Sequence, residues 1–163
     1  MPDAAKMMPT TIQERLGWKI TPELYEAIRR LWIKHSIAED SRDLQGLIDT
    51  LTQDCVYEIP ALDQRWEGHD GARQFYTTFL GAFPDVKITP VSSWAAGDYV
   101  VVTGTFEGTN TGDMPSMKMK KTGNKVSAHF LEIFQFDKGK VTNDWLFYNG
   151  AAFATQLMAP AKK

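Results

Sequence analysis

The sequence predicts an α+β fold, in which helices cover one face of a curved and mostly antiparallel sheet. Apolar residues in the first half of the chain recur at the three-and-four spacing of helices. After residue 85 the pattern changes to the two-residue alternation of strands, interrupted by turn sequences rich in Gly and Asp. Helices followed by strands are typical of the α+β class. We therefore expect an N-terminal arm at residues 1–20 and a single domain over residues 21–163.

Three helices are expected in the first half of the chain. The first follows Thr21, whose hydroxyl can cap it, and has Pro22 in its first turn. His35 lies on its apolar face, where a core-facing helix normally carries an apolar residue. A second, shorter helix begins at about Asp43, and a third follows the turn at residues 68–71. The residues that define the three apolar faces are Leu24, Ile28, Leu31, Trp32, Leu44, Leu47, Ile48, Leu51, Phe75, Phe79 and Phe83.

Strands and one closing helix are expected in the rest of the chain. Pro60 ends the first strand, because proline lacks the N–H group that a sheet needs. The segments Ala96-Gly97-Asp98 and Asp137-Lys138-Gly139 have the composition of tight turns. The expected strands are residues 55–59, 86–94, 99–107, 125–136 and 140–148, and the expected closing helix is residues 151–158.

Composition excludes several classes of function. The chain has 163 residues, with 18 basic and 20 acidic side chains and a net charge of -2, so it has no footprint for nucleic acid. The single cysteine, Cys55, can form neither an internal disulfide nor a thiolate zinc site. No segment approaches the ~20 apolar residues of a membrane span, and the N-terminus lacks the apolar block of a signal peptide. We expect a cytoplasmic protein without nucleic-acid or membrane partners.

Several short motifs follow one another in a characteristic order. They are Gly68-His69-Asp70-Gly71, Ala82-Phe83-Pro84-Asp85, Gly108-Thr109-Asn110-Thr111-Gly112, Gly139-Lys140-Val141, Trp145 and Gln156-Leu157. In this order and spacing the motifs resemble those of the SnoaL-like polyketide cyclases, of the nuclear transport factor 2-like superfamily, over about residues 24–158. The resemblance implies a cone-shaped α+β barrel, closed at one end and open to substrate at the other. The superfamily also includes ketosteroid isomerase, scytalone dehydratase and limonene epoxide hydrolase, so the fold does not fix the function.

The chain departs from the family at the residues that imply catalysis. The acid/base Asp of the cyclases, and the Asp of limonene epoxide hydrolase, match Leu146. Asn149 replaces another frequent Asp, and Asn110 replaces the His of the family's loop motif. The base of ketosteroid isomerase matches Ile59. The mechanisms of these relatives therefore cannot be transferred directly.

Glu132 is the first candidate for catalysis. Alternation along residues 130–136 places it on one face with Phe130, Phe134 and Phe136, which indicates an apolar interior. It also matches the protonated Asp of ketosteroid isomerase. Burial disfavours a carboxylate and raises its pKa, which suits proton transfer near neutral pH. The alternative is a Glu that pairs with a nearby Arg or is hydrogen-bonded inside the barrel.

Three further side chains are candidates for catalysis. His35 matches the helix position of the Tyr that holds the oxyanion in ketosteroid isomerase, and imidazole titrates near neutrality. Tyr57 alternates with Ile59 and should point inward, where it could hold a substrate oxygen. Asp144 shares a face with Leu146 and Tyr148, and we expect it near the start of its strand and solvated. The alternatives are a satisfied core histidine and a core tyrosine.

Aromatic and aliphatic residues from several elements should line the cone and favour a flat hydrophobic ligand. Residues 110–124 combine Gly, Met and Lys, and form either an adaptable lid or a solvated loop. A metal site from His35 and Glu132 lacks the usual ligand spacing, so no metal and no cofactor are expected. The expected lining is Trp32, Ile59, Phe75, Phe79, Trp94, Phe106, Phe130, Phe134, Leu146 and Tyr148.

We hypothesise a cofactor-independent acid/base enzyme that acts on a bulky aromatic or polycyclic small molecule. Glu132 and His35 would exchange protons while Tyr57 positions a substrate oxygen. Because the cyclase Asp is missing, a lyase (retro-aldol cleavage or dehydration) is favoured over an aldol cyclase or an isomerase. A non-catalytic hydrophobic ligand-binding protein is the hypothesis from another class. We expect a homodimer, since one face of a curved sheet usually needs covering.

Overall fold

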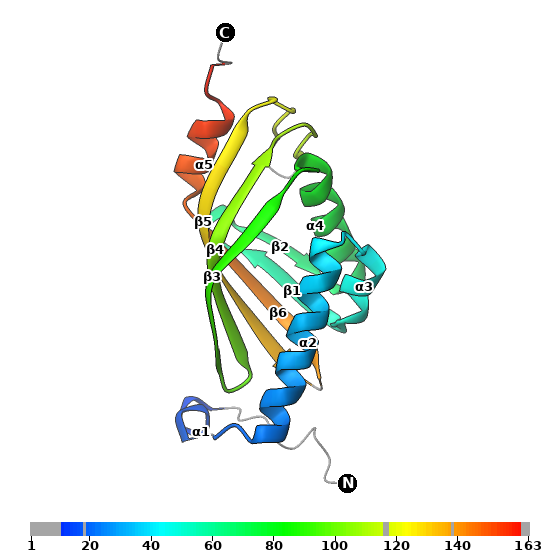
Figure 1. The fold of residues 1–163 in the computed structure, drawn as a ribbon, viewed down its shortest axis with the longest axis vertical. Coiled ribbons are helices and arrows are strands. Elements are labelled where there is room, and N and C mark those ends of the chain that lie inside the picture. The colour runs from blue at the N-terminus through cyan, green and yellow to red at the C-terminus, as the bar shows by residue number, and fades with distance from the viewer. Residues whose placement is uncertain (1–10, 18, 116–117, 138, 161–163) are drawn as a thin grey trace.

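The computed structural model describes residues 11–17, 19–115, 118–137 and 139–160 (Figure 1). Across these residues one sheet has the strand order β2-β1-β6-β5-β4-β3. β1 and β6 are parallel, and the other neighbouring strands are antiparallel. The strands are β1 (Leu51–Ile59), β2 (Gln64–Glu67), β3 (Lys87–Ala96), β4 (Tyr99–Thr109), β5 (Lys125–Asp137) and β6 (Lys140–Tyr148).

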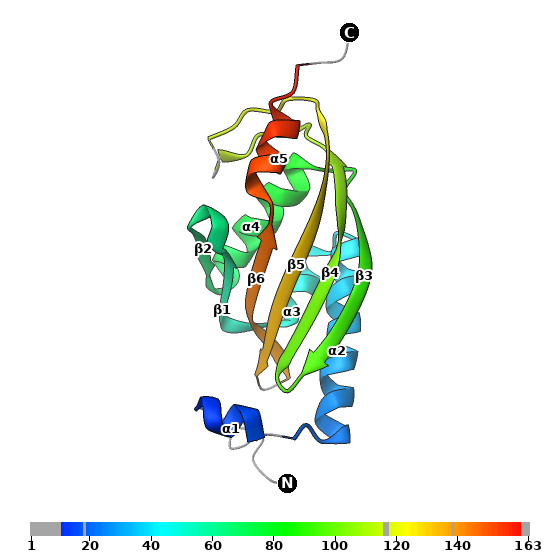
Figure 2. The same ribbon diagram turned by 90° about the vertical axis from the view of Figure 1, so that its left-hand side faces the viewer.

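Helices pack along one side of the curved sheet. Figure 1 shows α2, α3 and α4 beside it, and the turned view of Figure 2 places the sheet in front of them. α5 packs against β5. This arrangement confirms the predicted α+β class. The helices are α1 (Ile12–Gly17), α2 (Pro22–Asp40), α3 (Leu44–Asp49), α4 (Gly68–Ala82) and α5 (Gly150–Leu157), with a short 3-10 turn, η2, at Pro60–Leu62.

Side-chain caps fix the starts of α2 and α3 where the sequence predicts them. The Thr21 hydroxyl accepts a hydrogen bond from the Leu24 N–H at 3.3 Å. The Asp43 carboxylate accepts one from the Gly46 N–H at 2.9 Å. Each cap satisfies a backbone donor that the first helical turn leaves without a partner. The predicted starts of these two helices are confirmed.

One helix lies inside the segment expected to be an irregular arm. Thr11 and Glu14 exchange hydrogen bonds at the start of α1: the Thr11 N–H donates to Glu14 Oε2 at 3.0 Å, and the Glu14 N–H donates to Thr11 Oγ1 at 3.2 Å. This reciprocal pair is a capping box, which the spacing of Thr and Glu could have predicted. Residues 1–10 of the expected arm lie outside the described residues.

The curved sheet of the expected cone-shaped fold does not close on itself. β2 and β3 are the two edges of the sheet, and among the described residues neither has a strand on its outer side. The sheet is curved but open, and α2, α3 and α4 lie along one side of it (Figures 1 and 2). β2 itself was not predicted, because four residues are too few to show a clear alternation.

Alternation along β5 turns its aromatic residues into the core, as predicted. Phe134 and Phe136 are buried, and Phe130 is nearly so. Gly104 on β4 is the register partner of Phe130. A Cβ at Gly104 would lie 2.7 Å from the Phe130 ring and 2.8 Å from the Thr89 carbonyl oxygen, closer than real Cβ contacts. Glycine is therefore needed here for the Phe130 ring to lie across β4.

Asn110 fixes the loop that follows β4. Its amide donates to the Gly112 carbonyl oxygen at 2.8 Å, and its Oδ1 accepts from the Thr122 N–H at 2.8 Å. Its backbone also exchanges hydrogen bonds with the segment 123–124. Asn110 is fully buried, and its hydrogen bonds hold the two ends of this loop together. That role explains an amide where the family's loop motif carries His.

Candidate active site

An apolar cavity lies between the sheet and the helices. It measures about 940 Å³ with its opening to solvent included. Residues of all six strands and of α2, α4 and α5 line it, together with one residue that follows α4 and one from the loop after β4. Its lining is Glu39, Ile59, Gln64, Trp66, Phe75, Thr78, Phe79, Phe83, Ile88, Phe106, Met114, Ala128, Phe130, Glu132, Leu146, Tyr148 and Phe153.

The cavity wall joins many aromatic rings to a few polar groups. Eight of the lining residues are aromatic, and none is Lys, Arg or His. Its ionisable acids are Glu39 on α2 and Glu132 on β5. A wall of this kind favours a bulky, ring-containing ligand and directs any polar chemistry to the two carboxyl groups.

Glu132 forms a pair with Asp144, on the neighbouring strand β6. Glu132 is half-buried in the cavity wall, whereas Asp144 is 2% exposed and lies behind it. The two carboxyl groups are hydrogen-bonded to each other, and Asp144 Oδ1 has no partner among the described residues. The expectation of a solvated Asp144 is wrong, because β6 is an inner strand and Asp144 lies beside Tyr57 of β1 and Phe134 of β5.

Burial raises the pKa of both members of the pair. For Glu132, burial comes first, followed by the charges of Asp144 and Glu39; for Asp144, burial again comes first, followed by the charge of Glu39. Their shared hydrogen bond raises the pKa of Glu132 and lowers that of Asp144. Near neutral pH the two carboxyl groups therefore retain protons and titrate as one unit.

Glu39 is a third acidic group at this site, and the sequence interpretation missed it. Its half-buried carboxyl lines the cavity and makes no side-chain hydrogen bond or ion pair with the described residues. Burial, followed by the charge of Asp40, raises its pKa to about 7. Glu39 follows His35 by four residues on α2, so helical spacing alone could have placed it on the same face.

Replacing Glu39 with Gln should change how stability depends on pH. The folded protein keeps the Glu39 proton up to about pH 7, whereas an unfolded chain releases it near pH 4.5. Between these values the folded state binds more protons, so its free energy of unfolding falls as pH rises. Urea unfolding should show Glu39→Gln gaining about 2 kcal/mol on the wild type between pH 5 and pH 8. Glu107→Gln, on the exposed face of β4, is the control, and an equal gain there would contradict the prediction.

His35 lies outside the cavity lining and is 0% exposed. Its Nδ1 is 2.7 Å from the Thr50 hydroxyl, which itself donates to the Leu47 carbonyl oxygen at 2.5 Å. The Thr50 oxygen must therefore accept from His35 Nδ1–H, which leaves Nε2 as the acceptor on the imidazole. Burial lowers the pKa of His35 to about 4, so the ring is neutral at neutral pH.

The imidazole holds two tyrosines in a chain of hydrogen bonds. Tyr76 OH lies 3.2 Å from His35 Nε2, and Tyr57 OH lies 2.9 Å from Tyr76 OH. Because Nε2 can only accept, Tyr76 donates to it and Tyr57 donates to Tyr76. Tyr57 is buried, lies beside Asp144 across β1 and β6, and is not part of the cavity lining. This chain connects α2 and α4 to the strand beside the carboxyl pair.

Thr50→Val should show how much the hydrogen bond between His35 and Thr50 contributes to the free energy of unfolding. Valine keeps the shape of threonine but leaves the His35 Nδ1–H without an acceptor, which costs about 1–3 kcal/mol in a buried site. Urea unfolding measures this cost, and imidazole nitrogen NMR shifts report any change of tautomer. Thr52→Val is the matched control, because the buried Thr52 hydroxyl has no partner among the described residues. Equal costs for the two variants would contradict a stabilising role for this bond, and an Nε2–H tautomer in the wild type would contradict its assigned direction.

The predicted lining residues divide into two groups. The structure places Ile59, Phe75, Phe79, Phe106, Phe130, Leu146 and Tyr148 in the cavity wall. Trp32 and Phe134 instead pack on each other in the core, with ring centroids 4.6 Å apart.

Trp94 points away from the interior and is 49% exposed. It is the register partner of Val101, whose neighbours Val100 and Val102 are buried, so Val101 and Trp94 lie on the outer face. The register shift between Pro90 and Ser92 reverses the alternation that would otherwise place Trp94 on the same face as Ile88.

Three of the other lining residues were missed because they belong to a loop or to a strand that the sequence did not predict. Gln64 and Trp66 come from β2, and Met114 comes from the 110–124 loop. Met114 brings this loop to the cavity wall, and its action as a lid stays a prediction. Among the described residues, no three His, Cys, Asp or Glu side chains are arranged to hold a metal ion. None of the described helices is long and apolar enough to cross a membrane.

Comparisons with known proteins agree with this architecture. The chain aligns with AclR from Streptomyces galilaeus, a candidate hydroxylase, at 26% identity over 83% of both chains, with a TM-score of 0.67. A candidate SnoaL-like polyketide cyclase from Jannaschia sp. CCS1 is 22% identical over 88% of this chain and 99% of that one, with a TM-score of 0.71. IdmH from Streptomyces antibioticus, a candidate polyketide cyclase, is 18% identical over 81% of this chain and 99% of that one, with a TM-score of 0.65. A search of curated proteins found no match. The model of the SnoaL-like domain matches residues 30–143, more than half of the chain, and the chain therefore belongs to the SnoaL-like family.

Proposed function

We propose that this chain is a cofactor-independent acid/base enzyme acting on a bulky, apolar, ring-containing small molecule, and that it is a lyase. One observation carries the proposal: a hydrogen-bonded carboxyl pair, Glu132 and Asp144, stands at the wall of a cavity that is otherwise mostly apolar. Such surroundings keep a carboxyl group protonated near neutral pH, where proton transfer is most efficient. The neighbouring candidate cyclases and hydroxylase are consistent with a substrate of this kind.

The pair can move a proton without leaving a net charge on Glu132. One Glu132 oxygen accepts a proton from the substrate while the other passes its proton to the Asp144 carboxylate. In a retro-aldol cleavage the accepted proton is that of the carbinol hydroxyl. The carbon–carbon bond then breaks, and its electrons form the enolate of the departing ketone. Returning the proton from the pair to the enolate carbon completes the cycle, so no cofactor is needed.

A second polar group is needed to hold the oxygen on which charge develops. Tyr148 is the hydroxyl in the cavity wall nearest in sequence to the pair, on the same face of β6 as Asp144 and Leu146. Burial raises its pKa, so the phenol keeps its proton and can donate a hydrogen bond to the oxygen. In the sequence hypothesis Tyr57 had this role. Tyr57 and His35 are proposed instead as positioning residues, because the Tyr76 chain holds Tyr57 in place beside Asp144.

Leu146 favours cleavage over ring closure. It is the register partner of Glu132, and it lines the cavity where the resemblance to the cyclases implies their acid/base Asp. The acid/base function has therefore moved from that position to the diagonal pair on β5 and β6. Aldol cyclisation and isomerisation remain possible for the same pair, since each requires the same proton transfers.

Two model reactions test this proposal without knowledge of the natural substrate. The first is the exchange of the α-protons of β-tetralone, a bicyclic ketone, for deuterium in heavy water, followed by NMR. The second is the retro-aldol cleavage of a naphthyl β-hydroxyketone, which releases a fluorescent naphthaldehyde. We expect the protein to accelerate both. If β-tetralone binds in the cavity but neither reaction is accelerated, the chain is a ligand-binding protein rather than an enzyme.

A further inference from the structure

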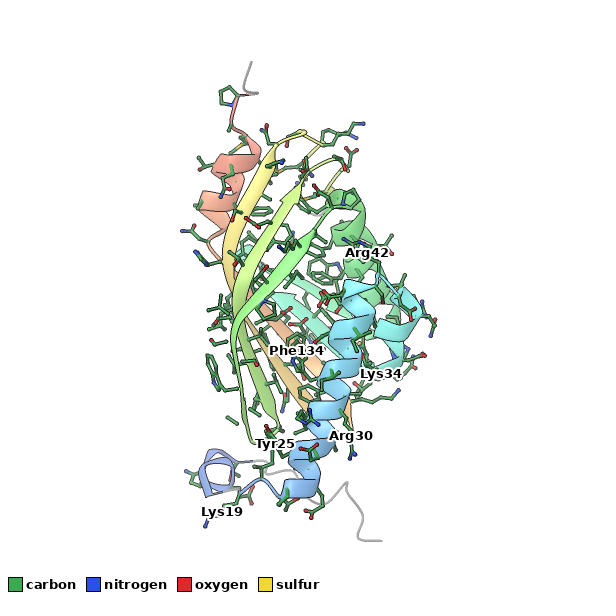
Figure 3. All side chains as sticks on the ribbon, in the orientation of Figure 1. Lys19, Tyr25, Arg30, Lys34, Arg42 and Phe134 are labelled. Carbon is green, nitrogen blue, oxygen red and sulfur yellow. The ribbon has the colours of Figure 1, made fainter. Side chains whose placement is uncertain are left out.

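The acidic end of the cavity has no matching positive charge. Glu39 and Glu132 line it and Asp144 lies behind Glu132, while no Lys, Arg or His is part of the lining. None of the three acids forms a salt bridge within the described part of the chain. Basic side chains of α2 and its C-terminal turn, among them Arg30, Lys34 and Arg42, are exposed to solvent instead (Figure 3).

The nearest basic groups are already engaged or lie on the outside. A small adjoining cavity on the other side of Glu39 is lined by Asp40, Arg42 and Lys87. The Arg42 guanidinium donates to the carbonyl oxygens of Pro84 and Val86, at 3.1 and 3.0 Å, and to that of Asp40. Lys87 is exposed at the start of the edge strand β3. The three acids are therefore left without a cation of the protein's own.

The surroundings of the two cavity acids favour a cationic ligand. Asp144, which lies behind Glu132 and outside the lining, is 2% exposed and adds a further acidic group to this end of the cavity. The rest of the wall consists largely of aromatic rings, including Trp66, Phe75 and Phe79, whose faces attract cations. Carboxyl groups beside aromatic rings are the chemistry that recognises an ammonium group.

We propose that the ligand of this cavity is a bulky apolar molecule that carries a protonated amine, which binds between Glu39 and Glu132 while its rings lie against the aromatic wall. This inference deepens the proposed function, because it takes the same cavity as the substrate site. The ammonium group would supply the positive charge that the lining lacks. The Asp144 carboxylate, one layer behind, would add attraction without direct contact.

A bound cation would also change the state of the acids. Without it, burial and mutual repulsion raise the pKa of Glu39, Glu132 and Asp144, so the cluster retains protons. An ammonium group lowers these pKa values and expels protons. Binding should therefore release protons and become tighter as pH rises through about 7, the pKa of Glu39. A substrate of this class would ionise the base that acts on it.

A matched pair of probes tests the inference. Naphthylmethylamine, a cation at neutral pH, and naphthylmethanol have the same rings and nearly the same shape, and titration calorimetry measures both affinities. We expect the amine to bind at least about tenfold more tightly than the alcohol at pH 8, since tenfold corresponds to roughly 1.4 kcal/mol and one charge-assisted hydrogen bond exceeds this. The preference should shrink at pH 5. Titrations in buffers of different ionisation enthalpy should show proton release with the amine alone.

Variants locate the effect. Glu39→Gln should weaken amine binding about tenfold and leave alcohol binding unchanged, and circular dichroism checks its fold. Glu107→Gln, which removes an exposed acid from the opposite face of the cavity wall, should change neither.

The outcomes separate this inference from the proposed function. If the alcohol binds as tightly as the amine, or if Glu39→Gln weakens both probes equally, the cation inference is wrong. In that case accelerated β-tetralone exchange would still support the enzyme. If neither probe binds and no exchange occurs, the cavity is not a ligand site and both proposals fail.

Discussion

Replacing Glu132 with Gln is expected to slow the deuterium exchange of β-tetralone by roughly two to four orders of magnitude, the usual contribution of a positioned acid/base group. Glutamine has nearly the same size, and its amide N–H can still donate a hydrogen bond to Asp144. It cannot accept a proton from the ketone. The fold and the affinity for β-tetralone should therefore be retained while the exchange rate is lost.

Two further variants make this result specific. Asp144→Asn should cause a loss of similar size, and combining it with Glu132→Gln should add little, because the two carboxyl groups act as one unit. Glu107→Gln should leave the exchange rate unchanged, since Glu107 is exposed on the outer face of β4. Should Glu132→Gln retain the wild-type rate, the carboxyl pair would not be the acid/base group, whatever the ligand.

Truncating Phe134 to Ala is expected to cost about 3–5 kcal/mol of folding free energy, the range for removing a fully buried phenylalanine. Phe134 is 1% exposed and contacts the rings of Trp32 and His35, with centroids 4.6 and 5.6 Å away. Figure 3 shows it between the sheet and α2. Since a domain has only about 5–15 kcal/mol to lose, the variant should be close to unfolding. Urea unfolding, followed by tryptophan fluorescence, measures the change.

The control for this truncation lies on the opposite face of the same sheet. Phe147 of β6 is 37% exposed, so Phe147→Ala should cost no more than about 1 kcal/mol. The cavity left by Phe134→Ala should also let water reach His35. Its pKa would then rise from about 4 toward 6.5, which NMR titration of the imidazole detects. Equal costs for the two truncations would contradict the central role of Phe134 in the core.

Local rules predicted those parts of the fold that local interactions determine. The caps formed by Thr21 and Asp43 could be predicted because each capping hydrogen bond spans only three residues. The whole pattern is therefore visible in a short stretch of sequence. Alternation on β5 identified Glu132 as an inward acid for the same reason. Trp94 was placed on the wrong face because one register shift in β3 reverses every side chain beyond it.

The environment of the site depends on contacts that no local pattern contains. Asp144 is buried because β6 pairs with β1, far away in the sequence, as well as with β5. His35 is withdrawn from the cavity by Thr50 and Tyr76, which belong to different elements. Sequence spacing thus indicates which acids point inward, whereas the fold determines which of them the cavity exposes.

The parallel pairing of β1 with β6 also bears on how the protein is made. Glu58 and Trp145, joined by a 2.6 Å hydrogen bond across these two strands, are 87 residues apart. On the ribosome, the strands on either side of this seam cannot meet until β6, which ends at Tyr148, has emerged. Tyr57 and Asp144 therefore become neighbours only at a late stage of synthesis, and contacts of such long range slow the search for the native state. Until then the apolar residues that β1 and β6 later bury stay exposed on the nascent chain, and exposed surface of this kind favours aggregation.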